Sequence, residues 1–182
     1  MAPASGYGVT MAKKRIEVRA TTADDWQQVR ALRLEMLADT PIAFGETLEA
    51  AQRVTEAGWR ERGRRGTNPH STALVAIDLD TGAWAGIMGG YVDDAVGSKP
   101  LLVGVYVSPA YRGKNSHVTD LLLAGVEEWA RGEGDELLLH VHESNPRAIA
   151  AYERRGFHAT GVTVPYVLDP STRELEMRKR LR

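Results

Sequence analysis

A short basic loop lies between two apolar segments, and its residue types suggest anion binding. The loop contains Arg112, Gly113 and Lys114; an apolar run, 101–107, precedes it, and an amphipathic helical pattern starts at Val118. A helix N-terminus presents unpaired N–H groups and the positive end of its dipole, and a glycine-containing loop before it can curl further N–H groups around an anion. With two cationic side chains in the same loop, this segment predicts a phosphate or pyrophosphate site.

Two common nucleotide-binding loops are excluded at this position. A P-loop requires a glycine five positions before Gly113 and a hydroxyl residue after the lysine, where this sequence has Ser108 and Asn115. The dinucleotide fingerprint G-x-G-x-x-G after a strand does not occur in the sequence. The predicted phosphate site therefore belongs to another class.

A second segment combines helix signals with a tyrosine. Asn145 is a good N-cap, Pro146 suits the first helical position, and Gly156 suits the left-handed residue that ends a helix. The helical period places Ala148 and Tyr152 on one face, four residues apart. The Tyr152 phenol is a candidate proton or hydrogen-bond donor; the alternative is a packed ring, as for most helical tyrosines.

The elements that must position these residues are strands and helices in alternation. Thr22 and Asp25 form a capping box before the first helix, and Asp80-Thr81-Gly82 predicts a hairpin turn. Expected strands cover residues 16–20, 72–79, 84–92, 101–107, 137–142, 157–165 and 174–178. Expected helices cover residues 26–37 and 47–62, a stretch from 118 to the glycines at 132 and 134, and a stretch from 146 to 156. Strands that alternate with helices indicate an α/β fold with a mixed sheet.

Composition excludes several classes of function. The 182 residues fit one domain, which we expect over 15–182, behind a disordered leader over 1–14 in which Met11 is an alternative start. The lack of cysteine excludes thiolate nucleophiles and disulfides. A net charge of -1 argues against a nucleic-acid or membrane partner, and no apolar run reaches the roughly 20 residues that span a bilayer. We expect a cytoplasmic protein.

The loop and the later helix together resemble the two signatures of the Gcn5-related N-acetyltransferases (the GNAT superfamily). The first usually reads Arg/Gln-x-x-Gly-x-Gly/Ala; Arg112 and Gly113 fit it, as does the upstream Val-Ser-Pro, whereas Asn115 and His117 stand where glycines are usual. Glycine suits such positions because the backbone approaches the pyrophosphate and can take a positive φ. The second signature, N-x-x-A-x-x-x-Y-x-x-x-G-F, is matched at every fixed position by residues 145–157. Both signatures in this order are specific, and the resemblance extends roughly from Ile16 to the end of the sequence.

The resemblance implies both a fold and an activity. The implied fold is α/β (α+β), with a mixed, mostly antiparallel twisted sheet of six to seven strands flanked by about four helices. The implied activity is the transfer of an acetyl group from acetyl-CoA to a primary amine of a small molecule or peptide, by direct attack in a ternary complex and without a metal. One strand is expected to separate from its neighbour and pair with pantetheine instead. The implied cofactor-binding residues are Val105, Tyr106, Val107, Arg112, Gly113, Lys114, Asn115, Ser116, His117, Val118, Asn145, Ala148 and Tyr152.

Tyr152 and His142 are the predicted catalytic residues. A phenol of pKa about 10 can donate to, or protonate, a thiolate whose conjugate acid has a pKa near 8.5. Many relatives carry a glutamate on the strand before the first signature, but 101–107 has no carboxylate. His142 ends a predicted strand and has an ordinary pKa suited to a general base. The alternatives are Tyr106, Asp93, Asp94, Glu143 and a water chain without a dedicated base.

Residues that could bind the acceptor are less well marked. Phe44 lies in a segment similar to one that borders the acceptor site in the family, and Asp93 is a second candidate. His140 and His142 share a strand face, but no third ligand follows nearby, so no metal site is predicted. The arginine cluster over 60–65 and the basic tail over 177–182 are expected to be solvated.

Two rival functions stay open beside the enzyme. Asn115, His117 and the missing glutamate would also fit a module that senses acyl-CoA without turnover. A partner-binding domain on a degenerate scaffold is the third possibility. Candidate acceptors are amino acids, polyamines, aminoglycosides or other antibiotics, and protein N-termini, and the late strands make a homodimer an expectation.

Overall fold

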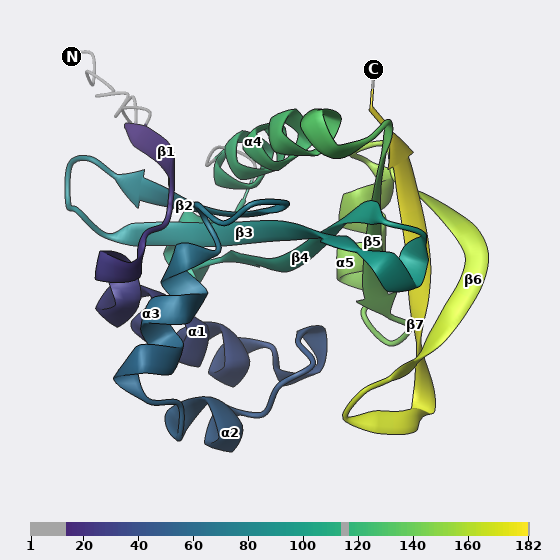
Figure 1. Cartoon of the computed structure of the whole chain (residues 1–182), viewed down its shortest axis with the longest axis horizontal. Helices are drawn as coiled ribbons and strands as arrows, with labels where there is room; N and C mark the ends of the chain where they lie inside the picture. The colour runs from purple at the N-terminus through teal and green to yellow at the C-terminus, as the bar shows by residue number, and fades with distance from the viewer. Residues whose placement is uncertain (1–13, 114–116, 182) are drawn as a thin grey trace, which may run out of the picture.

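A seven-stranded twisted sheet organises the molecule (Figure 1). The computed structural model describes residues 14–113 and 117–181; most of the predicted leader, and Lys114, Asn115 and Ser116 of the predicted phosphate loop, lie outside the described residues. The strands are β1 (Ile16–Ala20), β2 (Ser71–Asp78), β3 (Trp84–Asp93), β4 (Lys99–Val107), β5 (Glu136–His142), β6 (His158–Tyr166) and β7 (Asp169–Arg180). Their order is β1-β2-β3-β4-β5-β7-β6, and only β4 and β5 pair in parallel. The predicted mixed, mostly antiparallel sheet is confirmed.

Helices cover both faces of the sheet. They are α1 (Trp26–Asp39), α2 (Leu48–Gln52), α3 (Glu56–Arg64), α4 (Val118–Glu133) and α5 (Pro146–Glu153). In Figure 1, α4 lies along one face and α1, α2 and α3 lie against the other. None of the helices in the described part of the chain has the length and apolar composition to cross a bilayer.

Two hydrophobic cores hold these layers together. Leu122 and Val126 of α4 pack with Leu139 and Phe157 in one core, which α5 also joins. The second core lies between α1, α3 and strands β3 and β4 and contains the fully buried Trp59. Burial of apolar surface on both sides of the sheet is the main source of its stability. The helices α4 and α5 cover one face of the half of the sheet made by β5, β7 and β6, and the segment Pro41–Ala43 contacts β5.

The strands β4 and β5 separate partway along their length. Their parallel register includes only Leu101 with Leu138 and Leu102 with Leu139, although β4 continues to Val107. At the same point β4 is bulged against β3, and Gly104 takes a φ of 60°, which glycine adopts without a steric penalty. The bulge turns β4 away from β5, so the sheet opens beyond residue 102, as the resemblance implies.

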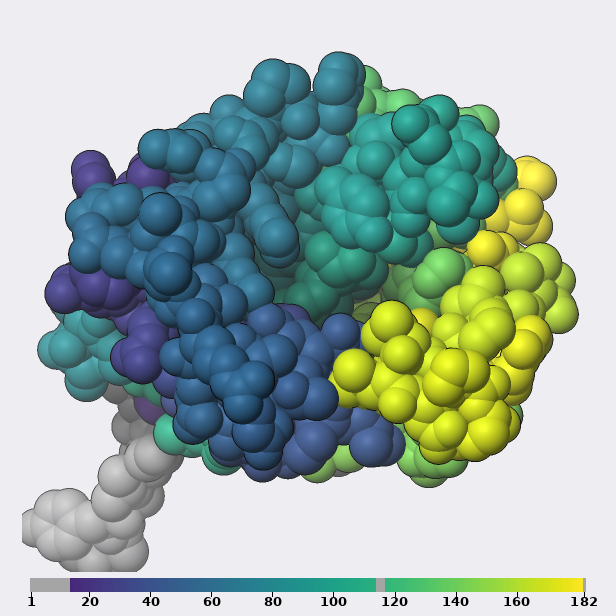
Figure 2. All heavy atoms as spheres, turned by 60° about the horizontal axis from the view of Figure 1, so that its bottom comes forward, coloured from purple at the N-terminus to yellow at the C-terminus, as the bar shows by residue number. Residues whose placement is uncertain are grey.

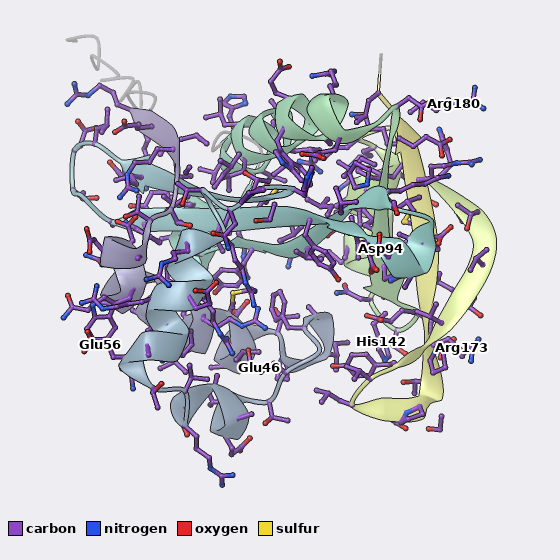
Figure 3. All side chains as sticks on the ribbon, viewed as in Figure 1. Glu46, Glu56, Asp94, His142, Arg173 and Arg180 are labelled. Carbon is purple, nitrogen blue, oxygen red and sulfur yellow. The ribbon has the colours of Figure 1, made fainter. Side chains whose placement is uncertain are left out.

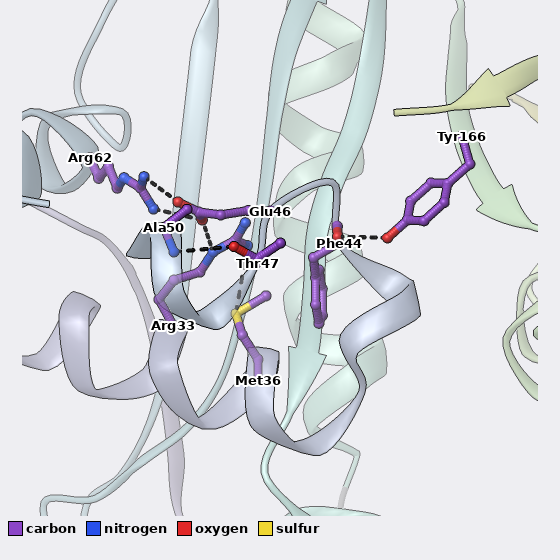
Figure 4. Close-up of polar contacts among 8 residues, drawn as sticks. All are labelled: Arg33, Met36, Phe44, Glu46, Thr47, Ala50, Arg62 and Tyr166. Carbon is purple, nitrogen blue, oxygen red and sulfur yellow. Dashed lines mark hydrogen bonds and ion pairs between the residues drawn. The ribbon is translucent and has the colours of Figure 1, made fainter. Parts of the chain in front are cut away.

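One predicted helix is wrong in its extent. The stretch over 47–62 forms two helices instead, because Thr47 and Thr55 each cap a new N-terminus by accepting a hydrogen bond from Ala50 N and Gly58 N. Thr55 is the local signal in the sequence for the second start, which a single helix over 47–62 does not take into account. The break between Gln52 and Glu56 separates α2 from α3, and Figure 4 shows Thr47 with Ala50 at the N-terminus of α2.

Candidate functional site

The loop between β4 and α4 takes a positive φ at each of its two described ends. Gly113 takes a φ of 108°, and His117, the N-cap of α4, takes a left-handed φ of 53°. The imidazole of His117 is exposed, while the next residue, Val118, packs in the core. A positive φ at His117 explains why glycine is usual there, since a side chain in this region costs about 1–2 kcal/mol.

The edge of β4 that faces the opening presents unused main-chain groups. Ser108 N donates to Ala85 O of β3 at 2.9 Å, so the alternation of a strand directs the N–H group of Val107 toward β5. Val105 lies in the bulge, where this alternation is interrupted. The paired register with β5 ends before these residues. The N–H group of Val107 is therefore placed to bind an extended ligand that replaces β5.

Arg112 and Tyr106 link this opening to α1. The Nε of Arg112 donates to Val107 O at 2.7 Å, its terminal nitrogen forms an ion pair with Asp39, and its guanidinium stacks over the Tyr106 ring. The Tyr106 hydroxyl donates to Glu35 at 3.0 Å; burial first, and then this carboxylate, raise the pKa of Tyr106 above its usual value. In this arrangement Arg112 links the end of β4 to α1, and its predicted contact with phosphate stays a prediction.

The helix α5 holds the second signature as the sequence predicts. The Asn145 side chain accepts a hydrogen bond from Ala148 N at 3.1 Å, and Gly156 ends the helix with a φ of 88°. Tyr152 is half-buried with its ring edge-on to Phe157, and its hydroxyl makes no hydrogen bond to a described residue. Burial raises the pKa of Tyr152 to about 12. The phenol is thus a protonated donor without a partner among residues 14–113 and 117–181.

A cavity of about 750 Å³ lies under the open part of the sheet, on the face of α1 and α3. Figure 2 shows the hollow between the helical segments in blue, the teal segment around β3 and β4, and the yellow end of β6 and β7. Its lining includes Val103 and Gly104 of β4 and His140 of β5. The cavity therefore reaches the place where β4 and β5 separate.

His142 is not arranged as a free base. The His142 side chain is buried, and its Nδ1 accepts a hydrogen bond from Ser144 N at 3.1 Å. The ring proton therefore lies on Nε2, which is 3.1 Å from Thr172 Oγ1. Thr172 Oγ1 in turn donates to Asp169 O, so it accepts from the imidazole. Figure 3 places His142 at the end of β5 beside β7. Because both ring nitrogens are engaged, the geometry favours a structural role that anchors the β6–β7 connection.

A different acid–base group lines the cavity, and sequence reasoning missed it. Glu174 of β7 pairs with His142 of β5 in the sheet, and Glu176 pairs with His140, so all four side chains share the cavity face. Burial raises the pKa of Glu174, and the two nearby histidines oppose this less strongly. His140 Nε2 is buried without a hydrogen-bond partner, 3.7 Å from Glu176. Only the shared histidine face could have indicated this site.

The two predicted acceptor residues are placed differently. Phe44 lines the cavity, with its carbonyl accepting from the Tyr166 hydroxyl at 3.0 Å (Figure 4). Asp93 lies outside the lining, where it caps the turn that follows β3 by accepting from Ala95 N at 2.8 Å. Arg62, expected on a solvated face, instead lines the cavity and binds Glu46. No group of three histidine, aspartate or glutamate side chains within the described ranges is arranged as a metal site.

Comparisons with known proteins match this chain to a family and to a fold. The model of the acetyltransferase (GNAT) family matches residues 31–157. The PaiA N-acetyltransferase of Thermoplasma acidophilum in complex with coenzyme A superposes with a TM-score of 0.69 at 21% identity, over 91% of this chain and 99% of that one. YncA of Salmonella typhimurium, a putative acetyltransferase with acetyl-CoA, gives 0.72 at 18% identity, over 92% and 95%. Nourseothricin acetyltransferase gives 0.55 at 27% identity, over 63% and 67%. No curated protein matches the sequence.

Proposed function

The chain belongs to the acetyltransferase (GNAT) family, and from this premise we propose that it transfers the acetyl group of acetyl-CoA to a primary amine of a small molecule or peptide. The observation that carries the proposal is that the cavity meets the opening between β4 and β5, at Val103, Gly104 and His140. A pantetheine arm in that opening would bring its thioester to an amine held in the cavity. Proteins of the same fold with bound coenzyme A or acetyl-CoA support this reading.

The acetyl-CoA arm and phosphates have matching donors on this chain. The outward N–H group of Val107, and that of Val105 in the bulge, would pair with the amide groups of pantetheine in the manner of an added strand. The turn from Gly113 to Val118, with its positive φ at His117 and the start of α4, would bind the pyrophosphate through backbone N–H groups. Lys114 would add its charge at the same place.

Acetyl transfer then needs one bond to form and one to break. The neutral amine nitrogen attacks the thioester carbonyl carbon, the C–N bond forms, and the C–S bond breaks to leave a thiolate. We assign Tyr152 to the thiolate because its hydroxyl is protonated at neutral pH and lacks a partner among the described residues. A preorganised donor of this kind stabilises charge that develops in the transition state.

The proton of the amine needs an acceptor on the cavity side. We assign this role to Glu174, because it lines the cavity and because its raised pKa makes it a better base than an exposed carboxylate. His140, which lines the cavity beside it, would shield or relay the charge. This assignment replaces His142, whose ring nitrogens are both used.

Release of free CoA thiol from acetyl-CoA, measured over a panel of primary amines, tests the function. We expect release that depends on both the protein and the amine, and a rise in melting temperature with CoA, since a ligand of the native state stabilises it. CoA binding without turnover on any amine would favour the acyl-CoA-sensing module, a function that the side chain at His117, in place of the usual glycine, would also fit. Failure of CoA to change the melting temperature would exclude both functions.

A further inference from the structure

One end of the cavity carries more positive charge than its own carboxylate can balance. Arg33 of α1, Arg62 of α3 and Arg65 just after α3 all line it, with Glu46 as the acid between them. Arg62 holds Glu46 with two hydrogen bonds of 2.9 and 2.7 Å, and Arg33 Nε donates to it at 2.9 Å (Figure 4). Arg65 has no carboxylate within ion-pair distance among residues 14–113 and 117–181. Three guanidinium groups therefore face one carboxylate.

The excess charge is held in a partly desolvated place. The side chains of Arg33 and Arg62 are each only 23% exposed, and that of Glu46 is 16% exposed. Burial lowers the pKa of Arg33, Glu46 opposes this, and the charges of Arg62 and Arg65 lower it further. Arg65 itself is exposed. Repulsion between Arg33 and Arg62 at low solvent exposure, to which the charge of Arg65 adds, is relieved by an anion that enters the cavity.

A second, independent observation concerns unpaired donors in the same cavity. Within the described chain, three buried side-chain nitrogen or oxygen atoms lack a hydrogen-bond partner, and two of these belong to lining residues, Trp59 and His140. Trp59 Nε1–H is a donor only, and its ring lies under the Arg62 guanidinium at 4.6 Å. A buried donor without a partner is costly, and an oxygen of a bound ligand would satisfy it.

The opposite end of the cavity has acid–base groups in place of arginines. Glu174 and His140 lie there, beside the opening in the sheet, while the arginines come from α1 and α3. The cavity therefore offers cations at one end and a proton acceptor at the other. A molecule that complements both ends has an anionic group and an amine.

We propose that the acceptor is an amino acid or a similar small amine that carries a carboxylate or phosphonate. This anionic group binds Arg33, Arg62, Arg65 and Trp59. Its amine then lies toward Glu174 and the thioester. This inference rests on the proposed acetyl transfer, and it goes further by naming the acceptor class. It excludes polyamines and aminoglycosides as preferred acceptors, because their additional cations would meet the arginine end.

Matched pairs of amines that differ only in the anionic group test the proposal. L-methionine with L-methioninamide, L-phenylalanine with its amide, and 2-aminoethylphosphonate with propylamine serve as probes with acetyl-CoA at about pH 9, above the ordinary pKa of an α-amino group, which is about 8. The alkylamines of the last pair, with an ordinary pKa near 10.4, are both mostly protonated there and are compared only with each other. We expect kcat/KM to favour the anionic member of each pair. In Arg65→Gln this preference should shrink by about 10- to 100-fold, the usual effect of one charged hydrogen bond.

Arg64→Gln is the matched control, because Arg64 lies one position away, forms an exposed ion pair with Glu61 and does not line the cavity. Equal use of both members of every pair, or an equal effect of the two variants, would overturn the inference and leave acetyl transfer intact. If no amine reacts, melting temperatures with each probe decide, with and without CoA. A larger shift with the acids supports the anion site, and identical shifts refute it. An absent CoA shift refutes the proposed function separately.

Discussion

Replacement of Tyr152 by phenylalanine separates catalysis from packing at this site. The ring of Tyr152 packs edge-on against Phe157 at 5.7 Å, and phenylalanine preserves that contact. The hydroxyl donates to no described residue, so its removal breaks no internal hydrogen bond among the described residues. We therefore expect the free energy of unfolding to change by less than about 1 kcal/mol.

The pKa of the phenol sets what the hydroxyl can do. At about 12, it exceeds the ordinary thiol pKa near 8.5 by roughly 3.5 units, so complete proton transfer to the thiolate is uphill by about 5 kcal/mol. Tyr152 should then act mainly as a hydrogen-bond donor to the developing thiolate. Loss of one such preorganised donor lowers kcat by about 10²- to 10³-fold, or roughly 3–4 kcal/mol.

Thiol-release kinetics and CoA titration on Tyr152→Phe measure the two effects separately. We expect a large fall in kcat with the Kd for CoA nearly unchanged. In the wild type, the rate should also not decline near pH 10, where an exposed tyrosine ionises, but only at higher pH. A kcat equal to that of the wild type would refute the assignment. So would a loss of CoA affinity that accounts for the whole change.

Three further predictions follow from other parts of the site. Glu174→Gln should lower kcat by about 10²- to 10⁴-fold without loss of CoA binding. In the wild type, kcat/KM should fall on the acid side as Glu174 becomes protonated, and the midpoint should lie above the pKa of an exposed glutamate because burial raises the pKa of Glu174. A pH–rate profile checks this, and an unchanged rate in the variant would assign the role to a water chain. Glu46→Gln should destabilise the fold by about 1–3 kcal/mol, measured by urea unfolding. Burial raises the pKa of Glu46 but Arg62 and Arg33 lower it more; the stabilisation is therefore present above the unfolded pKa near 4.3 and is lost as the pH falls through the lowered folded value, where variant and wild type should converge. His117→Gly should relieve the strain of the left-handed backbone at this position, by up to about 1 kcal/mol after the greater freedom of glycine in the unfolded chain is subtracted. Thermal unfolding and CoA titration should therefore show equal or higher stability and affinity. Weaker CoA binding would mean that the imidazole itself contacts the phosphates.

The family model and the many similar folds bear out the α/β class and the mixed sheet that the sequence predicts. Local signals suffice for this. Asn145, Pro146 and Gly156 start and end a helix through their own backbone and side-chain chemistry, and the turn at 80–82 joins two strands that pair directly. The left-handed residue at His117 is local in the same sense. Each of these features depends on neighbours within a few positions, which the sequence displays.

The cavity and its charges are decided by tertiary structure. Glu174 meets His140 because β7 inserts between β5 and β6, an order of strands that no local pattern encodes. Arg62 resembles any solvated helical arginine until α3 packs beside α1 and the break before it brings Glu46 within hydrogen-bond distance. His142 has a side chain suited to a base, yet Thr172 of β7 and Ser144 N engage both of its ring nitrogens. The sequence determines the chemistry of each side chain. Which groups are buried together depends on contacts between segments that are distant in the sequence, and burial changes the pKa of these groups and hence their function.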